Sequence, residues 1–193
     1  MRLDVGKEIG NLNNVTALGS DDLTSIDLEQ GQVTVISLWA STCKFSLKHM
    51  DDLQKSIEAN KAKWSGKVRF LALSTDRDKS KQQAAITERG LTGFEHFNIM
   101  NPQCKLHLYF NAKKTPFCVL VDKKGKVASV AHPSFRKLDD DIQYLVKGRA
   151  IQGRGCISLK AAKENDWKEA GPDVDKKEVE KTVKQFMDLC QEL

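Results

Sequence analysis

Apolar positions along the chain follow two patterns, short continuous runs and helical spacing. The runs Val33 to Ala40 and Val68 to Ser74 are rich in β-branched and aromatic residues and are short, so they predict buried strands. Between Cys43 and about Lys61, apolar residues recur at helical spacing: Leu47, Met50, Leu53 and Ile57. Strand, helix and strand in this order predict a parallel, right-handed βαβ unit.

The later segments continue the same alternation. The turn-rich tetrapeptide Asp122 to Gly125 joins two apolar runs and predicts a β-hairpin over Phe117 to Val121 and Lys126 to Val130. Spacing, turn and capping signals predict the other elements: a helix from Asp78 to Arg89 closed by Gly90, a strand from His96 to Met100, a helix from Asn101-Pro102 to about Phe110, and a helix from Phe135 to Gly148. The predicted fold class is α/β.

Composition changes near Gly148, where we place a domain boundary. Residues 1–148 are predicted to form one domain, and residues 149–193 a basic linker followed by a helical extension. The linker is basic and contains glycine from Arg149 to Gly155, and Gly171-Pro172-Asp173 starts a charged helix with an apolar stripe. The stripe either packs on its own domain or binds a protein partner.

Charge and hydropathy exclude several classes of function. The net charge is +5, but lysines are dispersed among acidic residues, so we expect no nucleic-acid partner. No apolar stretch approaches the ~18 residues of a membrane span, and Met1 to Gly10 has no apolar signal core. We therefore expect a soluble, cytoplasmic protein, with a mitochondrial matrix or ciliary location left open.

The cysteines and glycines carry no recognisable cofactor motif. The five cysteines are odd in number and unevenly spaced, which favours a reducing compartment over a disulfide scaffold, and they lack the paired spacing of a zinc site. Glycine patterns of phosphate loops and dinucleotide sites are absent as well. We expect no metal and no cofactor.

Cys43 is the residue with the most distinctive position. It lies where the first predicted strand passes into a helix, and in the first turn of a helix unpaired amides and the helix dipole favour thiolate over thiol. Ser46 stands at the position of the second cysteine in a Cys-x-x-Cys redox pair. Because serine cannot close a disulfide, Cys43 either acts as a single thiol or has lost its chemistry.

Several short motifs occur in a characteristic order. Trp39-Ala40 and Cys43 follow the first strand, Leu73 to Asp76 closes the next, and Thr115-Pro116 precedes the hairpin. In this order they resemble the TlpA-like redoxin branch of the thioredoxin superfamily over about Gly6 to Gly148. The resemblance implies a thioredoxin-like fold with a central mixed β-sheet flanked by helices. Ala40 stands where peroxiredoxins have a threonine, and the long interval from Cys43 to Pro116 argues against a glutaredoxin.

The resemblance also implies roles for individual residues. Thr115-Pro116 matches the family's cis-proline loop, which faces the active cysteine, and Trp39 would flank the site, although ordinary core packing is compatible with it. His49 stands where the family tends to have a glutamate near the thiols. It is either a proton carrier or positive charge beside Cys43, or an exposed helical histidine.

Two hypotheses on function remain open from the sequence. In the first, the chain is a thiol-disulfide oxidoreductase: Cys43 attacks protein or glutathione disulfides, Ser46 steadies the thiolate, and a mixed disulfide forms. External glutathione then releases it, or Cys104 does as a resolving thiol; otherwise Cys104 is a helix-packing residue, and Cys118 is expected in the core. In the second hypothesis, the redox-degenerate domain is an interaction subunit of a larger assembly.

Overall fold

The computed structural model describes residues 3–28, 31–101, 103, 104, 106, 110, 115–130 and 138–151. The chain divides into two compact units, Met1–Ala150 and Ile151–Leu193, and all helices and strands of the described residues belong to the first. Most of the predicted helix after Asn101 lies outside the described residues. The same holds for the predicted linker beyond Ile151 and for the C-terminal helix.

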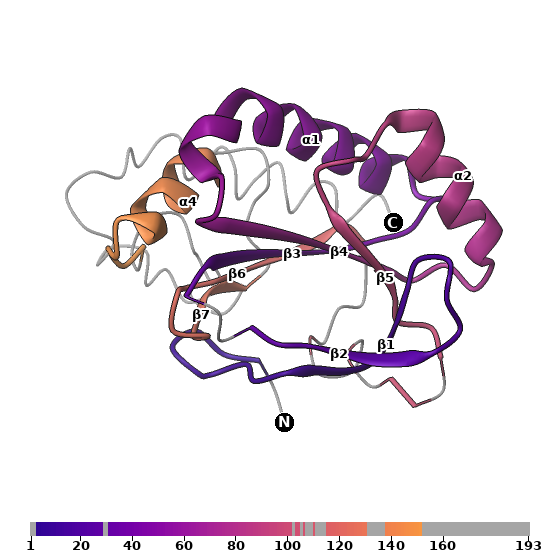
Figure 1. The fold of residues 1–193 in the computed structure, drawn as a ribbon, viewed down its shortest axis with the longest axis horizontal. Coiled ribbons are helices and arrows are strands. Elements are labelled where there is room, and N and C mark those ends of the chain that lie inside the picture. Colours follow the sequence, from indigo (N-terminus) through magenta and orange to yellow (C-terminus); the bar gives the residue numbers. More distant parts are fainter. Residues whose placement is uncertain are drawn as a thin grey trace, which may run out of the picture. The chain divides into compact units, whose positions relative to one another are not determined.

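The described residues form a seven-stranded mixed sheet in the order β2-β1-β5-β4-β3-β6-β7 (Figure 1). Strand β3 pairs parallel with β4, and β4 parallel with β5, whereas the other pairs are antiparallel. The predicted βαβ unit, the hairpin and the mixed sheet are therefore confirmed. The strands are β1 (Leu12–Ala17), β2 (Leu23–Ile26), β3 (Val33–Trp39), β4 (Val68–Ser74), β5 (Glu95–Asn98), β6 (Phe117–Val121) and β7 (Val127–Val130).

The β1–β2 hairpin was not predicted, because its pattern in the sequence is weak. In β1, Asn13 and Asn14 interrupt the apolar positions, and three of the four residues of β2 are exposed. A register shift between Leu12 and Val15 further breaks the alternation expected of a regular strand. Neither segment therefore has the apolar run by which the other strands were recognised.

Helices α1 (Lys44–Trp64), α2 (Lys79–Arg89) and α4 (Leu138–Val146) match predicted segments, although residues 135–137 at the start of the last lie outside the described part. Capping explains the bounds of α2. The Asp78 carboxylate accepts a hydrogen bond from the Ser80 amide at 2.9 Å, and Gly90 ends the helix in the left-handed conformation at φ +60°. Helix α1 begins directly after Cys43, in agreement with the predicted strand-to-helix transition.

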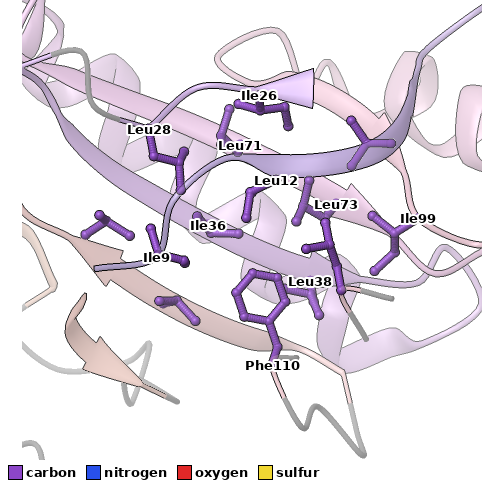
Figure 2. Close-up of a cluster of buried hydrophobic side chains, with 14 of the residues drawn as sticks. Ile9, Leu12, Ile26, Leu28, Ile36, Leu38, Leu71, Leu73, Ile99 and Phe110 are labelled. Atoms are coloured by element: carbon purple, nitrogen blue, oxygen red, sulfur yellow. The ribbon is translucent and has the colours of Figure 1, made fainter. Parts of the chain in front are cut away.

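Two clusters of apolar side chains cover the two faces of the sheet. On one face, Trp39 and Ala72 pack against Met50 of α1 and Ala85 of α2, and Figure 1 shows these helices above the strands. The other face carries the larger cluster (Figure 2), which includes Ile9, Leu12, Ile26, Leu28, Ile36, Leu38, Leu71, Leu73, Ile99, Cys104 and Phe110. Alternate residues of β3 thus enter different clusters, so the strand is buried on both sides.

The N-terminal segment pairs with the start of β7. The Gly6 amide donates to the Val127 carbonyl at 2.8 Å, and the Val127 amide donates to the Lys7 carbonyl at 2.9 Å. The Ile9 amide adds a bond to the Gly125 carbonyl at 3.0 Å, and Glu8 forms an isolated antiparallel bridge with Lys126. These bonds satisfy backbone groups that an edge strand otherwise leaves unpaired.

Candidate active site

Cys43 is the N-cap residue of α1. Its backbone is extended, with φ −97° and ψ 110°, and its carbonyl accepts the first hydrogen bond of the helix from the Leu47 amide at 3.0 Å. The first turn contains no acidic residue that would offset the positive end of the helix dipole. The thiol is free and half-buried, so it lies in a position that favours an anionic sulfur.

Opposing effects act on the pKa of the Cys43 thiol. Partial burial is the largest single effect and raises the pKa, because it disfavours the charged thiolate. Hydrogen bonds from the Ser46 hydroxyl, from the Ser46 and Phe45 amides and from the Thr115 side chain act in the other direction. Together they outweigh burial, and the pKa of Cys43 lies below its ordinary value.

The Ser46 hydroxyl is buried beneath the sulfur's helix turn without a fixed partner. The residue has 0% exposure, and its Oγ has no hydrogen-bond partner among the described residues. The hydroxyl nevertheless lies near enough to Cys43 to lower the pKa of the thiol. Because no other group of the described residues bonds this hydroxyl, it is available to the Cys43 thiolate.

Thr115 and Pro116 form the loop that lies beside the Cys43 sulfur. The Cys43 thiol donates a 3.6 Å hydrogen bond to the Thr115 carbonyl, and the Thr115-Pro116 peptide bond is cis. Antiparallel pairing of Leu38 with Phe117 places this loop beside the end of β3. The structure therefore brings together Cys43, Ser46, Thr115 and Pro116, although Cys43 and Thr115 are 72 residues apart along the chain.

Trp39 and His49 lie under the site rather than on its surface. Trp39 is fully buried in the cluster beneath α1 and α2. His49 is buried too, and its Nε2 lies 3.2 Å from the Ser37 Oγ of β3, so the alternative of an exposed helical histidine is wrong. A helix places residues three apart on one face, and Ser46 and His49 both point toward the sheet.

Cys104 and Cys118 are free thiols in the protein interior. Cys104 is 1% exposed in the larger cluster, on the face of the sheet that carries Ile36 and Leu38, and burial raises its pKa. Cys118 is likewise buried, as expected, and burial raises its pKa to about 12 despite a hydrogen bond with Ser37. The structure does not bring Cys104 to Cys43.

Asp76 holds the loop that carries Cys43, a role that the sequence did not reveal. Its buried carboxylate accepts hydrogen bonds from the Ser41 amide at 3.0 Å, the Ser41 hydroxyl at 2.9 Å and the Ser74 hydroxyl at 2.8 Å. Parallel pairing of Trp39 with Ser74 brings the carboxyl ends of β3 and β4 to one edge of the sheet. The signal that could have revealed this role is the place of Asp76 in the sequence, two residues after the end of β4.

Comparison with known proteins agrees with this geometry. A family model described as Thioredoxin-like matches residues 31–127. The chain belongs to this thioredoxin-like family. The thioredoxin domain of a thiol-disulfide oxidoreductase from Bacteroides vulgatus has a TM-score of 0.62 at 19% identity, covering 75% of this chain and 99% of that domain. A thiol:disulfide interchange protein from a Bacteroides species has a TM-score of 0.61 at 20% identity, covering 79% and 95%.

These solved structures show that the thioredoxin-like chain has the predicted fold. No curated protein sequence matches it significantly. Within the part of the chain that the structure describes, no helix has the length and apolar character needed to cross a membrane. Nor do the described His, Cys, Asp and Glu side chains form a group of three or more suited to a metal ion.

Proposed function

We propose that this thioredoxin-like chain is a thiol-disulfide oxidoreductase that works with a single thiol, Cys43. The observation that carries the proposal is the half-buried sulfur at the start of α1, whose pKa is lowered although burial alone raises it. The thiolate attacks one sulfur of a protein or glutathione disulfide. A new disulfide to Cys43 forms, the substrate's bond breaks, and its electron pair leaves with the other sulfur as a thiolate.

The neighbouring residues support this step in different ways. The Ser46 hydroxyl donates to the thiolate, and the Thr115 carbonyl and Pro116 border the sulfur where the substrate arrives. Two residues support the site from the interior: Trp39 packs in the cluster beneath the helices, and His49 forms a hydrogen bond with Ser37. This assignment places four residues at the reacting sulfur and two beneath them.

A second thiol must release the mixed disulfide. Ser46 cannot supply it, and Cys104 reaches Cys43 only if its segment leaves the core. Since no thiol of the described residues lies beside Cys43, we assign the second exchange, which regenerates the Cys43 thiolate, to an external thiol such as glutathione. The cytosol, where such thiols are abundant, is the proposed location.

The pH dependence of Cys43 alkylation tests the proposal. Because only the thiolate reacts, a lowered pKa moves the half-maximal rate to lower pH than the ~8.5 of a free thiol. Iodoacetamide labelling of the folded protein, followed by peptide mass spectrometry, measures the rate at Cys43 separately from the other cysteines. A midpoint at or above the free-thiol value would contradict the proposal.

Replacing Ser46 with alanine is expected to raise the midpoint of Cys43 alkylation. The variant removes the hydroxyl that favours the thiolate, so less thiolate is present at neutral pH. The free energy of unfolding should change by less than about 1 kcal/mol, because the lost hydroxyl is buried without a fixed partner. Urea unfolding serves as the control, and a large loss of stability with an unchanged midpoint would assign Ser46 to packing alone.

One observation favours the second candidate, an interaction subunit that performs no exchange. Serine occupies the position of the usual partner of Cys43, so the dithiol of a Cys-x-x-Cys pair is missing. Residues 149–193 remain the predicted segment for contact with a partner protein. An unshifted alkylation midpoint together with normal folding would favour this candidate over the oxidoreductase.

A further inference from the structure

Phe45 exposes more of its surface than any other large apolar side chain of the described residues. Four such side chains are exposed, Val5, Leu23, Phe45 and Met100, and Phe45 has the highest exposed fraction at 54%. Single exposed apolar residues are common on protein surfaces. Phe45 differs from the other three in its position, since it lies two residues from the nucleophilic sulfur in the first turn of α1.

The backbone and side chain of Phe45 both lie close to the reacting sulfur. Its amide is one of the groups that lower the pKa of Cys43, so the aromatic side chain starts from a residue that is itself in contact with the sulfur. The Lys44 ammonium lies over one face of the ring, 5.2 Å from its centroid. The other face is therefore the one that a substrate can contact.

Thr115 is the second residue that borders the sulfur. Its carbonyl oxygen lies 3.6 Å from the Cys43 sulfur and can accept a hydrogen bond from a substrate amide once the thiol is ionised. This carbonyl and the Phe45 amide both lie at the sulfur, so a substrate that reaches Cys43 meets both residues. An extended polypeptide offers both a backbone N–H and side chains at this spacing.

We infer that Phe45 determines specificity, and that the substrates are disulfides in extended polypeptides with an apolar side chain next to the attacked cysteine. The inference rests on the proposed exchange at Cys43. Packing of the apolar side chain on Phe45 removes apolar surface of both partners from water. Glutathione flanks its cysteine with glutamate and glycine, so it lacks the group that this ring recognises.

Two chromogenic peptides test the inference. Each is an acetylated, amidated hexapeptide whose cysteine forms a mixed disulfide with 5-thio-2-nitrobenzoate, and the residue after the cysteine is leucine in one and glycine in the other. Attack by Cys43 forms a disulfide with the peptide cysteine and releases the nitrothiobenzoate as a coloured thiolate. Stopped-flow absorbance gives the single-turnover rate for each peptide.

The ratio of the two rates reports the contact with Phe45. The wild-type chain should react with the leucine peptide on the order of 10-fold faster than with the glycine peptide. In Phe45→Ala the ratio should approach one, and Phe45→Leu should restore most of it. Leu23→Ala removes a comparably exposed side chain on β2, 45% exposed, and should keep the wild-type ratio.

The possible outcomes separate this inference from the proposed function. Equal rates with both peptides for the wild-type chain, or an unchanged ratio in Phe45→Ala, would overturn the specificity but leave the exchange standing. A uniform loss of rate in Phe45→Ala would also overturn it, because the residue would then act on Cys43 itself. If the wild-type chain releases no nitrothiobenzoate from either peptide, both the exchange and the specificity fail.

Discussion

Replacing Cys43 with serine is expected to abolish disulfide exchange by the folded protein. A serine hydroxyl is not ionised near neutral pH and forms no disulfide, whereas Cys43 is the described thiol that combines exposure with a lowered pKa. Burial raises the pKa of both Cys104 and Cys118, so neither should replace it while the protein is folded. Release of nitrothiobenzoate from a peptide mixed disulfide should fall to the rate of the buffer control.

Cys104→Ser is the matched control for this loss. It removes a thiol from the core cluster but leaves the site at α1 intact, so exchange should continue at about the wild-type rate provided that the variant is folded. Thiol titration in denaturant verifies that each variant lacks only one cysteine. Substantial exchange by folded Cys43→Ser would refute the proposed role of Cys43 and would direct attention to the remaining cysteines.

Replacing Asp76 with alanine is expected to destabilise the protein by about 3 kcal/mol. The variant leaves the Ser41 amide and the Ser41 and Ser74 hydroxyls without their charged acceptor in a buried position. It also frees the loop that positions Cys43, so we expect slower alkylation of Cys43 at neutral pH. Urea unfolding and alkylation kinetics measure the two effects separately.

Two further variants determine whether the effect of Asp76 is local. Asp76→Asn keeps one acceptor oxygen and should lose less stability than the alanine variant. Asp122→Ala removes a carboxylate that accepts bonds from the Lys124 and Lys126 amides in the hairpin turn. It should reduce stability without changing the reactivity of Cys43. If Asp122→Ala and Asp76→Ala slow alkylation equally, Asp76 has only a structural role.

Much of the fold could be predicted because the central strands are buried on both faces. A strand such as β3, with every residue buried, appears in the sequence as a short run of mainly apolar residues in which only Thr34 and Ser37 are polar. The ends of α2 were predicted correctly because its capping residues, Asp78 and Gly90, are local signals in the sequence. By contrast, β1 and β2 have exposed and irregular positions, so their pairing depends on contacts distant in sequence.

The site could be predicted only in part, because local sequence does not determine the direction of every side chain. Cys43, Ser46 and Thr115-Pro116 were found through their places at the ends of elements. Cys104 comes shortly after the end of β5, but its side chain enters the core cluster. The bond between Ser41 and Asp76 joins residues 35 positions apart and leaves no periodic signal.

The covered edge of β7 limits how copies of this protein can associate. The bonds of Gly6, Lys7 and Ile9 occupy the start of β7 on its outer side, and among the described residues no strand pairs with the outer side of β2. Growth of a fibre by strand addition requires two free edges in each copy. Among the described strands, β2 is the edge that stays open along its length while the start of β7 is occupied, so we expect copies that join through β2 to end at a closed pair.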